Sequence, residues 1–169
     1  NDIRFLDNAG VTELSHWLAS TNGVAPNRTA TFWVKVADDL DSNQSIHIYY
    51  NQIGFDSASD GEATFIFFDD FSGDLSKWTA HAENGSVSQS SGYVEIGGGS
   101  TDGNDKHGWT AIGTEGHYDG FVDGIIEGRL YLSSEAIAEV GFRGDYDAND
   151  GYKARFDARS DKGVSNVKP

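Results

Sequence analysis

The residues best suited to metal chemistry lie in the stretch DYDANDGYKARFD, residues 145–157. Asp145, Asp147 and Asn149 alternate ahead of Gly151. Calcium loops use this spacing, because oxygen ligands that project from every second residue surround the ion while a glycine lets the chain turn. The spacing therefore predicts a calcium site at Asp145, Asp147 and Asn149.

The same stretch departs from the strict calcium loop of EF-hand proteins. That loop has glycine at its sixth position and glutamate at its twelfth, whereas Asp150 and Phe156 hold those positions here. Asn, Asp and Gly are also typical of hairpin turns, since they tolerate positive φ and form local hydrogen bonds. A plain hairpin turn between strands at 136–143 and 152–159 is therefore the alternative interpretation.

A loop rich in Gly and Asp supplies a second set of candidate binding residues. Sugars stack on aromatic faces, and Asp, Asn or Arg side chains hold their hydroxyl groups. The alternative is that Trp109 points into the core together with Ala111, and the pattern GWTAIG allows either orientation. The predicted ligand-binding residues are Trp109, His107, Tyr118, Asp105 and Asn104.

The carboxylates that come nearest to a glycosidase pair in the sequence do not meet its spacing. The best candidates, Asp123 and Glu127, would lie about 13 Å apart along a strand, whereas the two hydrolytic mechanisms need about 5 to 9.5 Å. The five His residues lack the spacing of a zinc site, and there is no Cys to complete one. We therefore expect no catalytic residues and a non-enzymatic protein.

Three glycosylation sequons of the form Asn-x-Ser/Thr begin at Asn27, Asn43 and Asn84. Each lies in a segment whose composition predicts a turn. In an exported protein of an organism that glycosylates, these Asn residues become modification sites, which fits a role at the cell surface.

The charge balance argues against two classes of partner. The formal net charge is −15, and the chain has only twelve Lys and Arg residues. Nucleic acids and anionic membrane surfaces need clustered basic residues, so we expect neither. The charge suits cation binding. No apolar stretch is long enough to cross a membrane as a helix, and the absence of Cys leaves no disulfide framework.

Short apolar runs between glycine-rich turns predict an all-β chain. The run at 29–36 has one wholly apolar face and Trp33 on the other, which is typical of a central strand. A single turn of helix should lead into an apolar strand at 65–68. The other expected strands are 3–6, 12–18 and 45–50, then 92–98, 108–113, 124–132, 136–143 and 152–159, whose spacing is typical of an antiparallel sandwich.

The first part of the chain resembles a known family. The runs DIRFLDNAGVTELSHWLAS, ATFWVKVADDLDSNQSIHIYYNQ and ATFIFFDDFSGDLSKW resemble a domain of unknown function that is common in archaeal and bacterial surface proteins. The family's YYGN strand end reads YYNQ here, without the glycine. The resemblance implies that residues 1–69 are the end of an uncharacterised β-domain.

From Asp70 onward the chain resembles the first part of a concanavalin A-like lectin/glucanase domain of the laminin-G-like kind. The resemblance rests on the order of DDFSGDLSKW, GYVEIGG, GIIEGRLYL, AEVGFR and NDGYKARFDA. It implies a jelly-roll sandwich over residues 70–169, incomplete at its end. Because calcium is common at the start of lectin-like sandwiches, it also implies a structural calcium ion at Asp69 and Asp70.

Together these observations predict a non-catalytic, extracellular, cell-surface segment that binds a polysaccharide or glycan with the help of structural calcium. Two alternatives stay open. The chain could be a subunit of an extracellular filament or surface layer, in which copies of itself pair strand to strand. It could also be a polysaccharide-degrading enzyme.

Overall fold

The computed structural model describes residues 3–37, 39–51, 53–82, 85–97, 110–114, 124–132, 137–142 and 152–157. The chain forms two compact units. The N-terminal unit consists of Asn1–Gly73 with Ser90–Tyr93, and the C-terminal unit consists of Asp74–Gln89 with Val94–Pro169.

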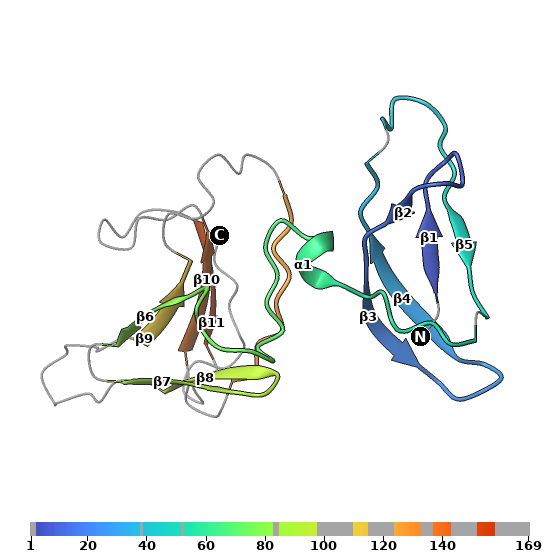
Figure 1. Ribbon diagram of the computed structural model, residues 1–169. Helices are drawn as coiled ribbons and strands as arrows, with labels where there is room; N and C mark the ends of the chain where they lie inside the picture. The colour runs from blue at the N-terminus through green and yellow to red at the C-terminus, as the bar shows by residue number, and fades with distance from the viewer. Residues whose placement is uncertain are drawn as a thin grey trace, which may run out of the picture. The chain divides into compact units, whose positions relative to one another are not determined.

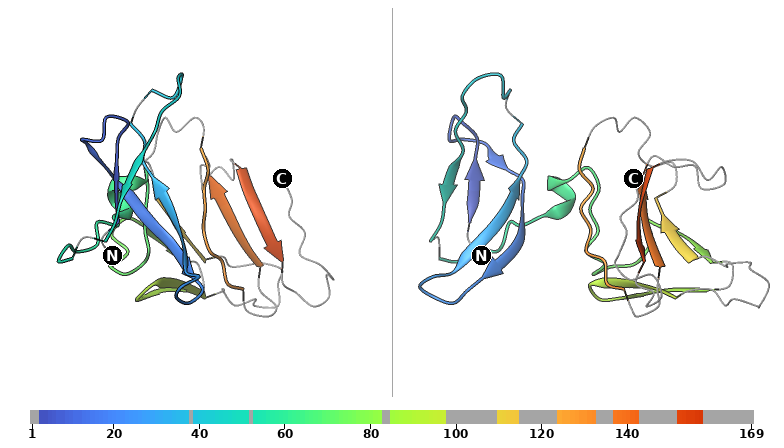
Figure 2. Two further views of the ribbon diagram at one scale, coloured as in Figure 1. Left: turned by 90° about the vertical axis from the view of Figure 1, so that its right-hand side faces the viewer. Right: turned by 180° about the vertical axis from the view of Figure 1, so that it is seen from behind.

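Two small antiparallel sheets build the N-terminal unit (Figure 1). In the first, β1 (Arg4–Leu6) lies between β2 (Glu13–Leu14) and β5 (His47–Tyr49). The second is a hairpin of β3 (His16–Asn22) and β4 (Thr29–Val34), with a register shift between Leu18 and Ser20. Figure 2 shows both sheets from two further sides.

The core of the N-terminal unit lies where the two sheets face each other. The Phe5 ring on β1 is 5.0 Å from that of His16 on β3 and 5.3 Å from that of Phe32 on β4, centroid to centroid. Phe5 is 5% exposed, Leu14 4% and His16 1%. Alternation along β3 and β4 sends these rings to one face of the hairpin, so their burial holds the two sheets together.

The expectation that 29–36 forms a central strand is wrong for the described residues, where β4 has a neighbour on one side only. Side chains cover its outer face in part, and Trp33 on that face is still 43% exposed. Trp33 packs edge-on against Phe65 at 6.1 Å, and Lys35 Nζ donates to the Ala63 carbonyl. The contact with Phe65 therefore explains why β4 carries Trp33 on the face that was expected to lie inside a larger sheet.

The segment after β5 contains the expected helical turn, α1 (Gly61–Thr64), but the expected strand at 65–68 is wrong. The rings of Phe65 and Phe68 stack at 5.8 Å. An extended strand would carry positions three apart about 10 Å from each other and to opposite faces. The chain bends here because both rings pack onto the outer face of the β3–β4 hairpin.

The strands after α1 form pairs, all of them in the C-terminal unit apart from the hairpin end at Ser90–Tyr93. They are β6 with β9, β7 with β8, and β10 with β11, and the register of β6–β9 and β10–β11 is antiparallel. The antiparallel pairing of β10 with β11 agrees with the hairpin expected around Asp145. The turn between these two strands lies outside the described residues. The bounds are Thr79–Ala82, Ser86–Ser90, Tyr93–Gly97, Thr110–Gly113, Ile137–Phe142 and Tyr152–Asp157 for β6 to β11.

The expectation of a strand at 124–132 is also wrong, because this segment is irregular. Ile125 is 84% exposed and Tyr131 93% exposed. An apolar run forms a strand only where neighbouring backbone completes its hydrogen bonds, and no strand pairs with this run in the described part of the chain.

The all-β fold class is confirmed, since strands dominate and α1 is only four residues long. The jelly-roll topology and the concanavalin A-like identity of 70–169 stay predictions. Among the described residues, no helix has the length and apolar character needed to cross a membrane.

Candidate functional site

The N-terminal unit carries an open hollow of about 570 Å³ beside β3 and α1. We call it the Trp17 hollow. Its walls combine two aromatic rings with hydroxyl and carboxylate groups, and polar residues outnumber apolar ones in the lining. The lining residues are Trp17, Ser57, Ala58, Ser59, Asp60, Gly61, Glu62, Phe68, Asp70 and Ser72.

Backbone hydrogen bonds hold the segment before α1 against β3. Ser59 forms a parallel bridge with His16, and its Oγ accepts from the Leu18 N–H at 2.9 Å. The Asp60 N–H donates to the His16 carbonyl at 2.8 Å. Trp17 lies between these two tethered positions on β3, so the wall of the hollow is fixed to the strand that presents its main aromatic side chain.

Packing around Gly61 sets the position of the second ring. The Trp17 and Phe68 centroids are 4.5 Å apart, with the rings tilted by 59°. A Cβ atom on Gly61 would overlap the Phe68 ring, so only glycine allows Phe68 to lie this close to the start of α1. Both rings are half-buried, which leaves part of each aromatic surface exposed to the solvent.

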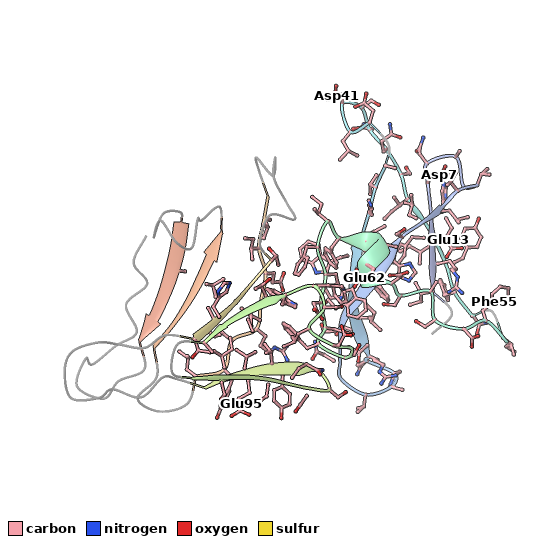
Figure 3. All side chains as sticks on the ribbon, turned by 60° about the vertical axis from the view of Figure 1, so that its left-hand side comes forward. Asp7, Glu13, Asp41, Phe55, Glu62 and Glu95 are labelled. Carbon is pink, nitrogen blue, oxygen red and sulfur yellow. The ribbon has the colours of Figure 1, made fainter. Side chains whose placement is uncertain are left out.

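Three carboxylates line the hollow, and two of them stabilise turns. Asp60 is the N-cap of α1, and its Oδ1 accepts from the Ala63 N–H at 3.0 Å. Asp70 Oδ1 accepts from the Ser72 N–H at 3.0 Å in an Asx turn. Glu62 projects from α1 (Figure 3). A carboxylate has about four lone-pair sites, so the bond from the Ala63 N–H does not use all those of Asp60.

Asp69, the neighbouring residue predicted to bind calcium, has a similar local role. Its Oδ1 accepts from the N–H of Phe71 at 2.7 Å, and Phe71 has a positive φ of 54°. The described residues contain no group of three or more His, Asp or Glu placed to hold a metal ion. Both acids stabilise turns, and calcium at Asp69 and Asp70 stays a prediction.

Hydrogen bonds lower the pKa of two acids outside the hollow. Asp7, in the β1–β2 turn, accepts from the Val11 amide at 2.9 Å and from the Thr12 amide at 3.2 Å, and these bonds lower its pKa from 3.8. The Ser76 hydroxyl and then its amide lower the pKa of Asp74. Each bond favours the charged carboxylate, so both groups support local turns.

Two of the three sequon residues, Asn27 and Asn43, lie in exposed stretches, the first between β3 and β4 and the second between β4 and β5. The other predicted site residues lie outside the described residues. They are Asn84 among the sequons, the ligand-binding set Trp109, His107, Tyr118, Asp105 and Asn104, and the calcium set Asp145, Asp147 and Asn149.

The sequence analysis did not single out the residues of the Trp17 hollow, apart from Asp70. A signal was present in the alternation from 16 to 18, which puts Trp17 on the face opposite His16. No pattern in the sequence indicated that Ser59 and Glu62 line the hollow. Their position depends on the parallel bridge between His16 and Ser59, which lie about forty residues apart.

Comparison with known proteins gives one match. Residues 1–81 match the family model described as "Domain of unknown function (DUF2341)". No curated protein matches the chain. No solved structure matches it either. The Trp17 hollow therefore lies entirely within the matched part of the chain.

Proposed function

We propose that this chain is a non-catalytic, glycan-binding segment of an extracellular surface protein. The observation that carries the proposal is the Trp17 hollow, in which two half-buried rings adjoin hydroxyl and carboxylate groups. Its volume of about 570 Å³ falls in the range of about 300–1,000 Å³ that small-molecule sites occupy.

The chemistry of the lining suits a sugar. The apolar C–H face of a pyranose would stack on Trp17 or Phe68, as ligands do on aromatic walls. Its hydroxyl groups would donate to Asp60 or Asp70 and exchange hydrogen bonds with Ser59. Because Ser59 and Asp60 are tethered to β3, these groups need little ordering when the ligand binds.

The extracellular setting rests on other support. The first runs of the chain resemble a surface-protein domain, and Asn27 and Asn43 are exposed sequon residues. Structural calcium belongs to the same proposal, at Asp145, Asp147 and Asn149 or beside Asp69 and Asp70. The resemblance of residues 70–169 to a lectin-like sandwich also supports carbohydrate binding.

A glycan array probed with the full chain, followed by calorimetry on the best oligosaccharide, tests the proposal. Trp17→Ala should weaken binding at least tenfold, because each lost stacking contact removes a large part of the contact area. Trp33→Ala is the matched control, since Trp33 lies opposite Trp17 in the β3–β4 register but outside the lining.

Several results would overturn parts of the proposal. Absence of binding to any glycan would remove the function, and equal losses in both Trp variants would remove the hollow as the site. New reducing ends after incubation with the glycan would show hydrolysis and contradict the non-catalytic assignment. Melting and binding that do not change with a chelator would remove calcium.

Open sheet edges favour a second candidate, a filament or surface-layer subunit. In the described part, β5 is the last strand of its sheet, and Ile48, Tyr49 and Tyr50 on and beside it are exposed. An exposed apolar edge strand pairs readily with another chain. A second copy would supply the partner, and its irregular apolar segment 124–132 would become a strand by pairing with β5.

Light scattering over a range of concentrations tests this candidate. Ile48→Lys should abolish assembly, because an edge lysine blocks strand pairing. Ile53→Lys places the same charge at an exposed site outside β5 and should leave assembly unchanged. A chain that stays monomeric at high concentration would contradict this candidate.

A further inference from the structure

The aromatic rings at the Trp17 hollow are inclined to one another and do not form a flat surface. The Trp17 and Phe68 rings, which both line the hollow, are tilted by 59° with their centroids 4.5 Å apart. Further along the outer face of the hairpin, Trp33 and Phe65 meet at 67°. Phe65 and Phe68 are parallel to within 11°, but these two rings stack on each other at 5.8 Å. The described rings of this face therefore offer no flat aromatic platform.

A flat platform is what a ribbon-shaped polysaccharide needs. In a β-1,4-linked glucose chain the successive rings lie nearly in one plane, so stacking of several units requires ring faces that share a plane. On Trp17 and Phe68 such a ribbon would stack on one ring only, because the second ring is inclined by 59°. A packed sheet of ribbons fits still less well, since its flat surface does not enter a hollow.

We infer that the Trp17 hollow selects single glycan chains whose successive rings are inclined to one another, as in β-1,3-linked glucans. This inference rests on the proposed glycan binding by the same hollow. The bend between neighbouring units lets one sugar ring stack on Trp17 and the next on Phe68, whose centroids are separated by about the length of one sugar unit. Two stacked units bury more apolar surface than one, and the gain grows with the area buried.

Two serines of the lining supply neutral hydrogen-bond donors next to these rings. Ser59 Oγ accepts from the Leu18 N–H at 2.9 Å, and Ser57 Oγ accepts from the Ser59 N–H at 3.3 Å. Neither hydroxyl donates to another group of the described residues. The bond that each oxygen accepts holds it in place, and its O–H group can donate to a sugar oxygen. A neutral glucan therefore finds both stacking and hydrogen bonds in the hollow.

The test compares glucose polymers that differ only in linkage and packing. The probes are the β-1,3-linked glucose hexamer, the β-1,4-linked glucose hexamer and microcrystalline cellulose, which is the packed form of the second linkage. Calorimetry with the full chain measures the two hexamers, and sedimentation measures binding to cellulose. The β-1,3-linked hexamer should bind at least about tenfold more tightly than the β-1,4-linked one, because it stacks on two rings instead of one. The chain should stay in the supernatant above cellulose.

Variants then assign the preference to the inclined pair of rings. Phe68→Leu keeps an apolar side chain beside Gly61 and removes the flat ring face. It should weaken binding of the β-1,3-linked hexamer severalfold and leave binding of the β-1,4-linked hexamer unchanged, which also shows that the variant is folded. Phe55→Leu is the matched control, because Phe55 is 59% exposed and lies outside the lining (Figure 3). Trp17→Ala should weaken binding of both hexamers.

Each outcome supports or overturns a specific statement. Equal affinity for the two hexamers, or sedimentation with cellulose, would overturn the linkage preference while the proposed glycan binding stands. Binding of other glycans on the array but of neither hexamer would overturn it as well. A preference that survives Phe68→Leu, or that Phe55→Leu reduces as much, would overturn the role of the inclined rings. No binding of either hexamer, together with a blank array, would overturn the proposed function itself.

Discussion

His16 and Trp17 are neighbours on β3, yet their side chains have opposite surroundings. His16 lies between the two sheets of the N-terminal unit with Phe5 and Phe32, and it is 1% exposed. Trp17 lies on the outer face with Phe68, half-buried and next to carboxylates and hydroxyl groups. One strand therefore carries the core on one face and the candidate binding site on the other.

The difference teaches that aromatic content alone does not mark a core. Each face of the β3–β4 hairpin carries a group of aromatic rings. A complete sheet covers the inner group, so its rings stabilise the fold. Within the described part of the N-terminal unit, α1 and the bend after it pack on the outer group. Incomplete cover leaves ring surface available to a ligand, and the polar residues of the covering segment supply the hydrogen bonds.

The largest expected effect comes from the inner face. Phe5→Ala removes the ring that joins the two sheets, and substitutions of this kind cost about 3–5 kcal/mol in the free energy of unfolding. Urea denaturation of the full chain should show the loss. Ile48→Ala, opposite Phe5 in the register but exposed, should cost less than about 1 kcal/mol. Similar losses for both variants would contradict the core assigned to Phe5.

A smaller effect is expected where Gly61 contacts the Phe68 ring on the outer face of the hairpin. Gly61→Ala would put a methyl group where the Phe68 ring lies, and overpacking of this kind costs about 1–3 kcal/mol. Displacement of Phe68 should also weaken glycan binding several-fold. The control is Gly73→Ala, since a Cβ there meets no atom within 4 Å. Unchanged stability and binding for Gly61→Ala would show that Phe68 does not need this contact.

His16 offers a test in which a buried residue is replaced without loss of stability. Its Nδ1 is buried without a hydrogen-bond partner, and such an atom costs about 1–3 kcal/mol of desolvation. His16→Phe keeps a ring between Phe5 and Phe32 and removes that cost. We expect unfolding to become harder by about 1 kcal/mol, as measured by urea denaturation. A loss of stability would indicate that the imidazole has a partner.

Sequence patterns predicted the inner face better than the outer one. Strands were expected at 3–6, 12–18 and 29–36, and β1 and β4 lie within the first and last of these, whereas the segment 12–18 divides into β2 and the start of β3, which runs on to Asn22. Such patterns report on each strand separately. They predicted a strand at 65–68, where Phe65 and Phe68 instead turn back onto the hairpin. That choice depends on contacts with Trp17 and Trp33, which are far away in the sequence.

The candidate site was harder to predict for the same reason. Asp70 was expected to bind calcium because calcium is common at the start of lectin-like sandwiches, and that expectation stays untested. The structure places it in an Asx turn at the rim of a hollow whose other walls come from β3 and α1. Its neighbours there, Ser59 and Glu62, belong to a polar segment that no periodicity distinguishes from an ordinary turn.

The smallest effect concerns the turn that closes the inner sheet, and it depends on pH. Hydrogen bonds from the Val11 amide first, and then from Thr12, lower the pKa of Asp7. A carboxylate whose pKa is lowered by folding contributes stability that is complete above its unfolded value of about 3.9. That contribution disappears as the pH falls through the folded pKa. Asp7→Asn removes the charge but keeps an acceptor for the two amides.

The difference in unfolding free energy between the wild type and Asp7→Asn should therefore be largest at neutral pH and should close as the pH falls through the lowered folded pKa of Asp7. Urea denaturation across this range measures it, and a direct NMR titration of Asp7 gives its folded pKa. A difference that stays constant with pH would mean that the turn depends on an acceptor oxygen and not on charge. The stability of the sheet formed by β2, β1 and β5 would then not depend on the charge of Asp7. The two faces of β3 would differ only in how completely other elements cover them.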